Sequence, residues 1–158
     1  MNKQSSILTS RILLFTACLL GLAFSSACAE SAVDPVPRDN DWWTERNAAV
    51  NARVKEGNVD LLMIGDSITH GWDGQDGGLP IWNTYYAKRN AVNMGFSGDR
   101  TQHVLWRLEN GHLDGITPKL AVIMIGTNNF KDNSAEEIAD GVKAIVAKLR
   151  TTLPEMNI

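Results

Sequence analysis

Three short apolar runs, each closed by a glycine and followed at once by small polar residues, constrain the fold of this chain more than any other feature. The runs cover residues 59–64, 91–94 and 120–125. A continuous apolar run of this length is typical of a strand buried on both faces. Strands of this kind that alternate with helices predict parallel βαβ units with right-handed crossovers, and hence an α/β fold with a doubly wound sheet.

Four segments around these runs have apolar residues at helical spacing. They cover residues 41–56, 82–88, 103–108 and 134–152. The last of them opens with Ser134 and Glu137 at the spacing of a capping box, in which each residue satisfies a free N–H group of the first turn. Residues 153–158 resemble a turn that leads into a fourth strand.

The first 30 residues have a different character from the rest. Lys3 and Arg11 precede an apolar run at 12–24, and small residues follow as far as Ala29. This layout is typical of a secretory signal peptide, and the run is shorter than the roughly 20 residues that a membrane-spanning helix needs. We expect cleavage after Ala29 and a secreted or periplasmic protein with no integral membrane span. The alternative is a lipoprotein anchored through Cys28.

The composition indicates one globular domain. Of the 158 residues, 44% are hydrophobic and 21% are charged, and the net charge is −3. Lys and Arg are scattered, so nucleic acid is not expected as a partner. Both cysteines, Cys18 and Cys28, lie in the predicted signal peptide, which leaves the mature chain without a disulfide or a Cys-based metal site. The predicted organisation is a signal peptide at 1–29, an exposed linker at 30–40 and a domain at 41–158.

The polar clusters that follow the apolar runs indicate where a ligand binds, because ligands of open parallel sheets bind at the carboxyl ends of the strands. The clusters cover residues 65–67, 95–99 and 126–129. A serine such as Ser67, directly after a buried strand and at the start of a helix, has its hydroxyl in the crevice and near the positive end of a helix dipole. That position suits a nucleophile whose reaction intermediate carries an oxyanion.

The three clusters together resemble a known family. Gly-Asp-Ser, Asn-Met-Gly-Phe-Ser-Gly-Asp-Arg-Thr and Gly-Thr-Asn-Asn are similar to the first three blocks of the GDSL/SGNH hydrolases. Residues 93–111 are particularly similar to the catalytic subunits of platelet-activating factor acetylhydrolase isoform Ib, and the resemblance runs from about Trp42 to residue 158. It implies a three-layer, flavodoxin-like SGNH fold. It also implies a carboxylic ester hydrolase for short acyl or acetyl groups, which acts on a small-molecule ester through an acyl-serine intermediate and needs no metal or organic cofactor.

The resemblance assigns roles to three residues. It makes Ser67 the catalytic nucleophile, and it builds the oxyanion hole from the backbone N–H groups of Ser67 and Gly98 and the side-chain amide of Asn128. Taken singly, these residues also fit a helix cap, a turn glycine and an Asx turn. Their occurrence in order after three successive strands favours the functional interpretation. Asp66 fits a role in ordering the turn through backbone N–H groups.

The base that activates the serine is not identified. In this family it is a histidine three residues after an aspartate, in a block near the C-terminus, and neither His70, His103 nor His112 has an aspartate at that spacing. His103 and His112 are interpreted as surface or structural residues. His70 lies one turn after Ser67 but has no evident carboxylate to orient it. We therefore expect the N-terminal part of a hydrolase domain, incomplete at its C-terminus, that has little or no esterase activity by itself.

Other interpretations and open points remain. The chain could be a noncatalytic binding module, a pseudoenzyme for acylated ligands. A nucleotide-binding domain is poorly supported, because no glycine-rich phosphate motif follows any of the strands.

Residues 122–125 are expected to form an open sheet edge that favours aggregation. Trp72 and Phe130 are candidates to line a pocket, although large aromatic residues more often serve packing. The acyl and alcohol specificity and the oligomeric state are not readable from the sequence.

Overall fold

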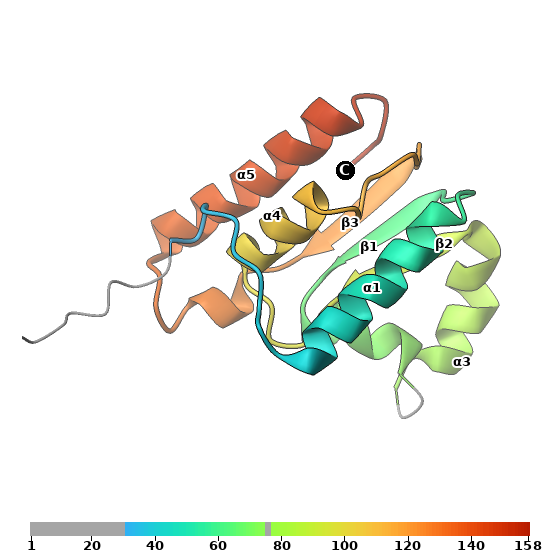
Figure 1. Ribbon diagram of the computed structural model, residues 1–158, viewed down its shortest axis with the longest axis horizontal. Helices are drawn as coiled ribbons and strands as arrows, with labels where there is room; N and C mark the ends of the chain where they lie inside the picture. Colours follow the sequence, from blue (N-terminus) through green and yellow to red (C-terminus); the bar gives the residue numbers. More distant parts are fainter. Residues whose placement is uncertain (1–30, 75–76) are drawn as a thin grey trace, which may run out of the picture.

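A parallel sheet of three strands forms the centre of the computed structural model, which describes residues 31–74 and 77–158 (Figure 1). The strands are β1 (Leu61–Gly65), β2 (Ala91–Gly95) and β3 (Leu120–Met124), in the order β2-β1-β3. In the register, Gly65 lies opposite Gly95 on one side and Met124 on the other, so the three strands end level with one another. The predicted strands and the α/β class are confirmed. The predicted signal peptide lies outside the described residues.

The helices and helical turns connect these strands. They are α1 (Asp41–Lys55), α2 (Ser67–His70), η1 (Gly71–Asp73), α3 (Leu79–Ile81), η2 (Trp82–Tyr86), η3 (Ala87–Arg89), α4 (Thr101–Glu109), η4 (Thr127–Asn129) and α5 (Ala135–Thr152). The helix expected at 82–88 is a π-helical turn followed by a 3-10 turn rather than one α-helix. The predicted capping box at the start of α5 is confirmed, with Ser134 N–H donating to Glu137 Oε2 over 2.7 Å.

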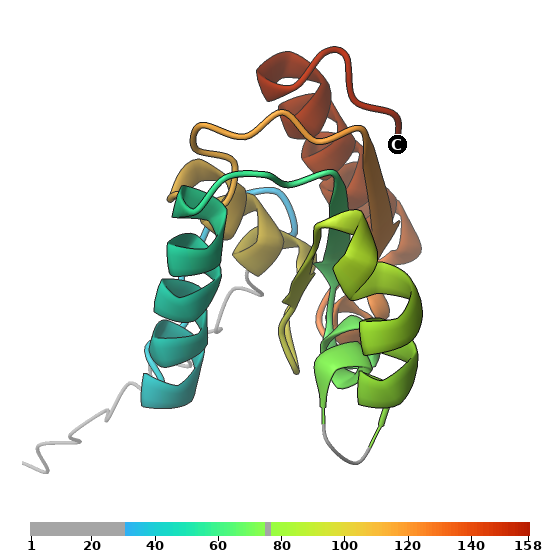
Figure 2. The ribbon, with the colours of Figure 1, turned by 90° about the vertical axis from the view of Figure 1, so that its right-hand side faces the viewer.

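The main hydrophobic core lies on the face of the sheet that α1 and α4 cover (Figure 2), and α5 packs against α4 and contributes to it. Leu62, Ile64, Val92 and Met94 point into this core from β1 and β2, and Leu149 enters it from α5. On the opposite face, Leu61 and Met63 pack under Trp82 of η2 in a smaller cluster. Side chains of β1 therefore alternate between two apolar layers, which explains why its sequence is apolar throughout.

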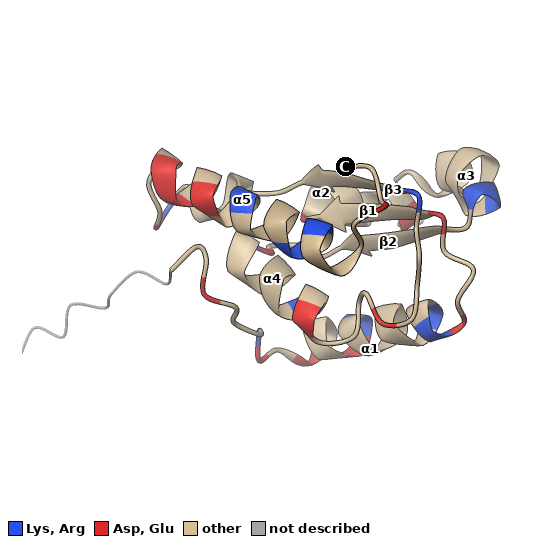
Figure 3. Cartoon of the chain, turned by 90° about the horizontal axis from the view of Figure 1, so that it is seen from above, with Lys and Arg blue, Asp and Glu red and all other residues tan. Residues whose placement is uncertain are grey.

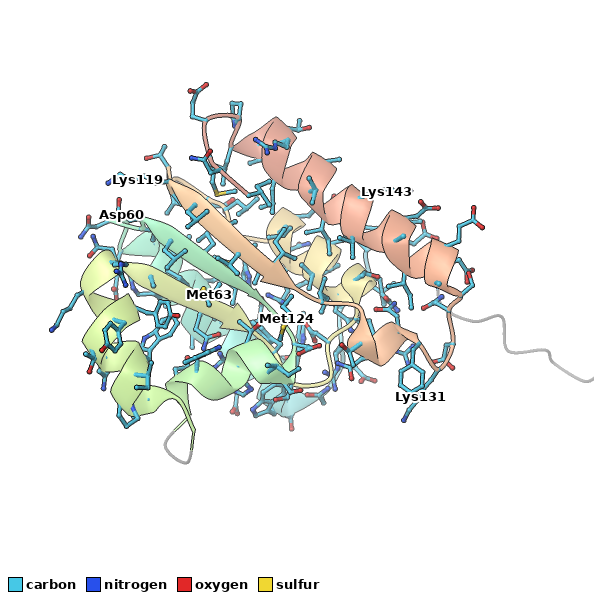
Figure 4. All side chains as sticks on the ribbon, turned by 180° about the vertical axis from the view of Figure 1, so that it is seen from behind. Asp60, Met63, Lys119, Met124, Lys131 and Lys143 are labelled. Atoms are coloured by element: carbon cyan, nitrogen blue, oxygen red, sulfur yellow. The ribbon has the colours of Figure 1, made fainter. Side chains whose placement is uncertain are left out.

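Strand β3 is covered on one face only. Leu120, Val122 and Met124 are 41%, 43% and 42% exposed, although their partners on β1 are buried. Figure 4 shows this side of the sheet, with Met63 on β1 and Met124 at the far end of β3 from Asp60 and Lys119. Beyond the outer edge of β3, Asn157 forms a single parallel bridge with Leu120, where a fourth strand was expected. The predicted exposure of β3 is confirmed, and it extends from the edge to one face.

The surface has no strong charge pattern. Lys and Arg are interspersed with Asp and Glu over the helices and loops (Figure 3). Within 31–74 and 77–158, no helix is long and apolar enough to span a membrane. Half of residues 31–40, the predicted linker, are exposed, whereas Ala32 is buried and its carbonyl accepts a 2.7 Å hydrogen bond from Thr101 Oγ1 of α4.

Candidate active site

The first polar cluster places Ser67 at the start of α2, immediately beyond the end of β1. Asp66 is buried and is the N-cap of α2, and its Oδ1 accepts a hydrogen bond from the N–H of Ile68 over 3.0 Å. The capping role therefore belongs to Asp66, as expected, and Ser67 is left exposed as the first helical residue. Because α2 has four residues, the free N–H groups of its first turn matter more than a large helix dipole.

Glycines at the strand ends allow α2 to lie directly against the sheet. A Cβ atom at Gly65 would collide with the side chain of Thr69, and one at Gly95 would collide with the backbone of His70. The side-chain amide of Asn93 on β2 also binds this helix, because it donates to the carbonyl of Thr69 over 3.0 Å. The position of Ser67 is therefore set by β1 and β2 together.

The second cluster forms a tight turn that presents Gly98. The N–H of Asp99 donates to the carbonyl of Phe96 over 3.0 Å, and Gly98 has a φ of +79°, which favours glycine. Gly98 is exposed, and its N–H donates to no acceptor within the described part of the chain. An N–H in this state is available to a ligand.

Asp99 is the structural centre of this turn. Its carboxylate is fully buried and accepts hydrogen bonds of 2.9 Å from Trp43 Nε1 and from Arg107 Nε, and Arg38 Nη1 lies 3.4 Å away. Arg107 is also fully buried, and its guanidinium lies 3.9 Å from the centre of the Phe96 ring. Burial lowers the pKa of Arg107 to about 10, against the opposing effect of Asp99, so the guanidinium stays charged at neutral pH. The Gly98 turn is thus anchored by a buried ion pair.

Sequence reasoning missed this ion pair. Arg107 lies among Val104, Leu105 and Leu108 on the buried side of α4, and a charged residue inside an apolar stripe was the available signal. The interpretation of His103 and His112 as surface residues is wrong, because both are buried, and the structural interpretation is right. Burial and then Arg107 lower the pKa of His112 well below 6.5, so the imidazole is neutral and its Nδ1 accepts from Arg107 Nη1 over 3.2 Å.

The third cluster places Asn128 beside the same turn. Its Nδ2 donates to the backbone carbonyl of Asp99 over 2.9 Å. An amide group carries two N–H hydrogens, so one remains for a ligand. The neighbouring Asn129 is buried, accepts a hydrogen bond from the N–H of Thr101 over 3.0 Å and donates to Gln102 Oε1 over 3.0 Å. The turn that carries Asn128 is therefore fixed to the start of α4.

The structure brings the predicted site residues to one edge of the sheet. Gly98 lies between Ser97, whose hydroxyl is 2.9 Å from His70 Nδ1 on α2, and Asp99, whose carbonyl binds Asn128. Ser67 also borders a pocket of about 370 Å³, together with Ile68, Gly71, Trp72 and Gly78. Of the two aromatic candidates, Trp72 lines this pocket, whereas Phe130 is 68% exposed.

The partner that would take the proton of Ser67 is not among these groups. No hydrogen bond joins the Ser67 hydroxyl to a histidine in the portion that the structure describes, and His70 binds Ser97 instead. The described residues also contain no group of three or more His, Cys, Asp or Glu side chains that could hold a metal ion. The catalytic roles of Ser67, Gly98 and Asn128 stay predictions.

Known proteins are similar to this chain in sequence and in fold. The GDSL-like Lipase/Acylhydrolase family matches residues 63–158. Platelet-activating factor acetylhydrolase IB subunit alpha2 of Homo sapiens is 37% identical over 132 residues, which are 84% of this chain and 55% of that protein. The IB subunit beta homolog of Drosophila melanogaster is 44% identical over 104 residues, 66% of this chain and 44% of that protein.

A solved structure of a candidate platelet activating factor from Streptococcus pneumonia has the same fold. It superposes with a TM-score of 0.56 at 23% sequence identity and covers 73% of this chain and 53% of that one. The chain spans about half the length of the curated relatives that it matches. The family match, which runs from within β1 to residue 158 and includes all three polar clusters, shows that this chain belongs to the GDSL-like lipase/acylhydrolase family.

Proposed function

We propose that this chain forms the nucleophile and oxyanion-hole part of a serine esterase that hydrolyses short-chain acyl or acetyl esters. The observation that carries the proposal is the arrangement around Asp99. The buried carboxylate of Asp99 fixes the turn that presents the free N–H of Gly98, and its carbonyl orients the amide of Asn128. In this proposal the N–H of Gly98 and the side-chain amide of Asn128 are two uncharged donors at the edge of the sheet where Ser67 lies.

The proposed reaction begins with attack of Ser67 Oγ on the carbonyl carbon of the ester. The carbonyl oxygen becomes an oxyanion, which accepts hydrogen bonds from the N–H groups of Ser67 and Gly98 and from the Asn128 amide. Donors that are already in place stabilise this charge without reorganisation. Collapse of the intermediate releases the alcohol and leaves an acyl-serine, which water then hydrolyses.

The proton of Ser67 needs an acceptor that we place outside these 158 residues. The chain has three histidines. His70 binds Ser97, His103 Nδ1 accepts from the N–H of Arg100, and His112 is buried against Arg107. We therefore expect the 158-residue chain to have little turnover by itself. A serine hydrolase that lacks triad members loses up to about a millionfold in kcat.

The pocket beside Ser67 supports a small acyl or alcohol group. Its volume of about 370 Å³ and its lining by Ile68 and Trp72 suit a short apolar substituent. The relatives that are named as acetylhydrolases support acetyl as the acyl group. Export is part of the same proposal, and the signal-peptide pattern of residues 1–29 supports it.

The test uses p-nitrophenyl acetate and a fluorophosphonate probe on the full product of the gene that encodes this chain. The expected result is ester turnover and phosphonylation of Ser67, located by mass spectrometry, with both lost in Ser67→Ala and kept in Ser134→Ala. Turnover that survives Ser67→Ala, or labelling at another serine, would contradict the proposal. The 158-residue chain, assayed in parallel, is expected to be at least a thousandfold slower.

A second candidate is a noncatalytic module that binds acylated ligands. The engagement of all three histidines away from Ser67 favours it. It predicts a soluble chain that unfolds cooperatively and binds a short-chain ester without turning it over. Ser67-dependent turnover by the 158-residue chain would exclude this candidate.

A further inference from the structure

The side chains of His70 and Ser97 connect the two halves of the candidate site. His70 is the last residue of α2, the helix that begins with Ser67, and Ser97 immediately precedes Gly98. His70 Nδ1 lies 2.9 Å from Ser97 Oγ. We propose that this contact is a positioning pair that fixes the N–H of Gly98 relative to the hydroxyl of Ser67. The inference rests on the proposed function of these two residues.

Neighbouring residues contact both the backbone and the ring of His70. The backbone of α2 around it is held by Asn93, whose Nδ2 lies 3.0 Å from the Thr69 carbonyl and 3.4 Å from that of His70. The indole of Trp42 covers the imidazole, with the two ring centres 5.4 Å apart. The backbone of α2 and the ring contact with Trp42 both restrain His70, so its contact with Ser97 limits movement of the turn relative to the helix.

The contact is compatible with the charge state of His70. Burial, and next the neighbouring Arg46, lower the pKa of His70, while Asp73 raises it, so the imidazole is neutral at neutral pH. A neutral imidazole has one N–H and one acceptor nitrogen, and a serine hydroxyl both donates and accepts. A hydrogen bond therefore forms in either tautomer.

The N–H of Phe96 at the start of the turn donates to the carbonyl of Gly65 at the end of β1 over 3.0 Å, and the hydrogen bonds of residues 97 and 99 go to other elements. The carbonyl of Ser97 accepts a 2.8 Å hydrogen bond from Arg38 Nη1, and Asp99 binds Trp43 and Arg107. These contacts tie the turn to the segment before α1, to α1 and to α4. Gly98 itself has a positive φ and the wide conformational freedom of glycine. The His70 contact is therefore a side-chain link between α2 and the residue next to Gly98, in addition to the backbone hydrogen bond between Phe96 and Gly65.

The accuracy of this coupling matters for the proposed chemistry. Oxyanion-hole donors act at 2.7–3.1 Å from the developing charge, and a displacement of about 1 Å can cost roughly a hundredfold in rate. A pair that only satisfied two polar side chains would have no such effect on the site. A positioning role and a merely structural role therefore predict different effects on the order of the Gly98 amide when the contact is removed.

The experiment uses six variants of the 158-residue chain, one of which is Ser67→Ala. Ser97→Ala and His70→Phe each break the contact, and the phenyl ring keeps the packing against Trp42. A double variant combines them. His70→Asn keeps a polar atom near the position of Nδ1, and Ser134→Ala is a distant control. The first readout is the ¹⁵N order parameter of the Gly98 amide, and the second is the affinity of butylboronic acid, which forms a tetrahedral adduct with an active-site serine.

The pair predicts loss of order at Gly98, from about 0.85 for rigid backbone toward about 0.6, in Ser97→Ala and His70→Phe. It also predicts about tenfold weaker boronate binding in each, the same tenfold in the double variant, and recovery in His70→Asn. An unchanged order parameter, or losses that multiply to about a hundredfold in the double variant, would overturn it. If Ser67→Ala leaves boronate binding unchanged, the proposed function fails, whereas the order parameter of Gly98 still decides the role of the pair.

Discussion

Replacement of Asp99 by alanine is the most informative perturbation of the candidate site. Asp99 and Arg107 are fully buried, and their ion pair has an N–O distance of 2.9 Å. Alanine would leave the Arg107 guanidinium charged, buried and without its carboxylate, and would also leave the indole N–H of Trp43 without its acceptor. Removal of one partner of a buried ion pair typically costs about 3 to 5 kcal/mol. A domain of ordinary stability unfolds with about 5 to 15 kcal/mol, so this loss is a large part of the total.

Urea denaturation followed by tryptophan fluorescence measures the loss, since Trp43 is 2% exposed and changes environment on unfolding. Asp140→Ala is the matched control. Its ion pair with Lys143 is exposed on α5, so a change of less than about 1 kcal/mol is expected. The double variant Asp99→Ala with Arg107→Met removes both charges and should cost clearly less than the sum of the single replacements. A loss below about 1 kcal/mol in Asp99→Ala, or additive costs in the double variant, would refute the reasoning.

Four further outcomes are expected. The pKa of His112 is lowered in the folded state by burial and by Arg107, so protons bind preferentially to the unfolded chain and stability should fall as the pH drops below about 6.5. Urea titrations of the wild type and His112→Gln at pH 7.5 and 5.5 check this, and an equal loss in both would contradict it. Gly71 has a φ of −60° and open space where a Cβ would lie, so Gly71→Ala should raise the free energy of unfolding by about 0.4 to 1 kcal/mol, measured by the same titration. Asn128→Ala should reduce turnover of p-nitrophenyl acetate by the full gene product about 100- to 1000-fold without loss of fold, measured by steady-state kinetics and circular dichroism. Val122→Lys places a charge on the exposed face of β3 and should slow aggregation in static light scattering, with stability changed by less than about 0.5 kcal/mol.

The sequence predicted the strands well because a short apolar run that ends near a glycine is a local signature, although β3 has the same pattern with one face exposed. Each strand is a continuous apolar run closed by a glycine or followed by one, and the packing of α2 requires the glycines at the ends of β1 and β2. The helix at 82–88 was less accurate. There the spacing of Trp82 and Tyr86 is helical, and their rings pack with centres 5.5 Å apart, but the backbone forms a π-helical turn. Apolar spacing alone does not distinguish these helix types.

The side-chain contacts that hold the candidate site residues in place were much harder to predict from the sequence. Asp99 and Arg107 are eight residues apart, and their pairing depends on the direction in which α4 leaves the turn. The contact between His70 and Ser97 spans 27 residues that include the whole of β2, so no short motif encodes it. Local patterns therefore indicated the residues proposed to meet the substrate, whereas the residues that fix their positions became visible only through tertiary contacts.

The exposed face of β3 and the candidate site are separate features of the same strand. Asn128 follows β3, but its side chain binds the carbonyl of Asp99, and the neighbouring Asn129 binds the N–H of Thr101 on α4. Asp99 and Asn129 are both fully buried, away from the exposed face of β3. A change on the bare face, such as Val122→Lys, should therefore leave boronate affinity within about twofold of the wild type. Asp99→Ala should weaken both the fold and boronate binding, because the same carboxylate supports the core and the Gly98 turn. If Val122→Lys weakened binding as much as Asp99→Ala did, the site would depend on whatever covers β3, and the anchoring role assigned to Asp99 would be wrong.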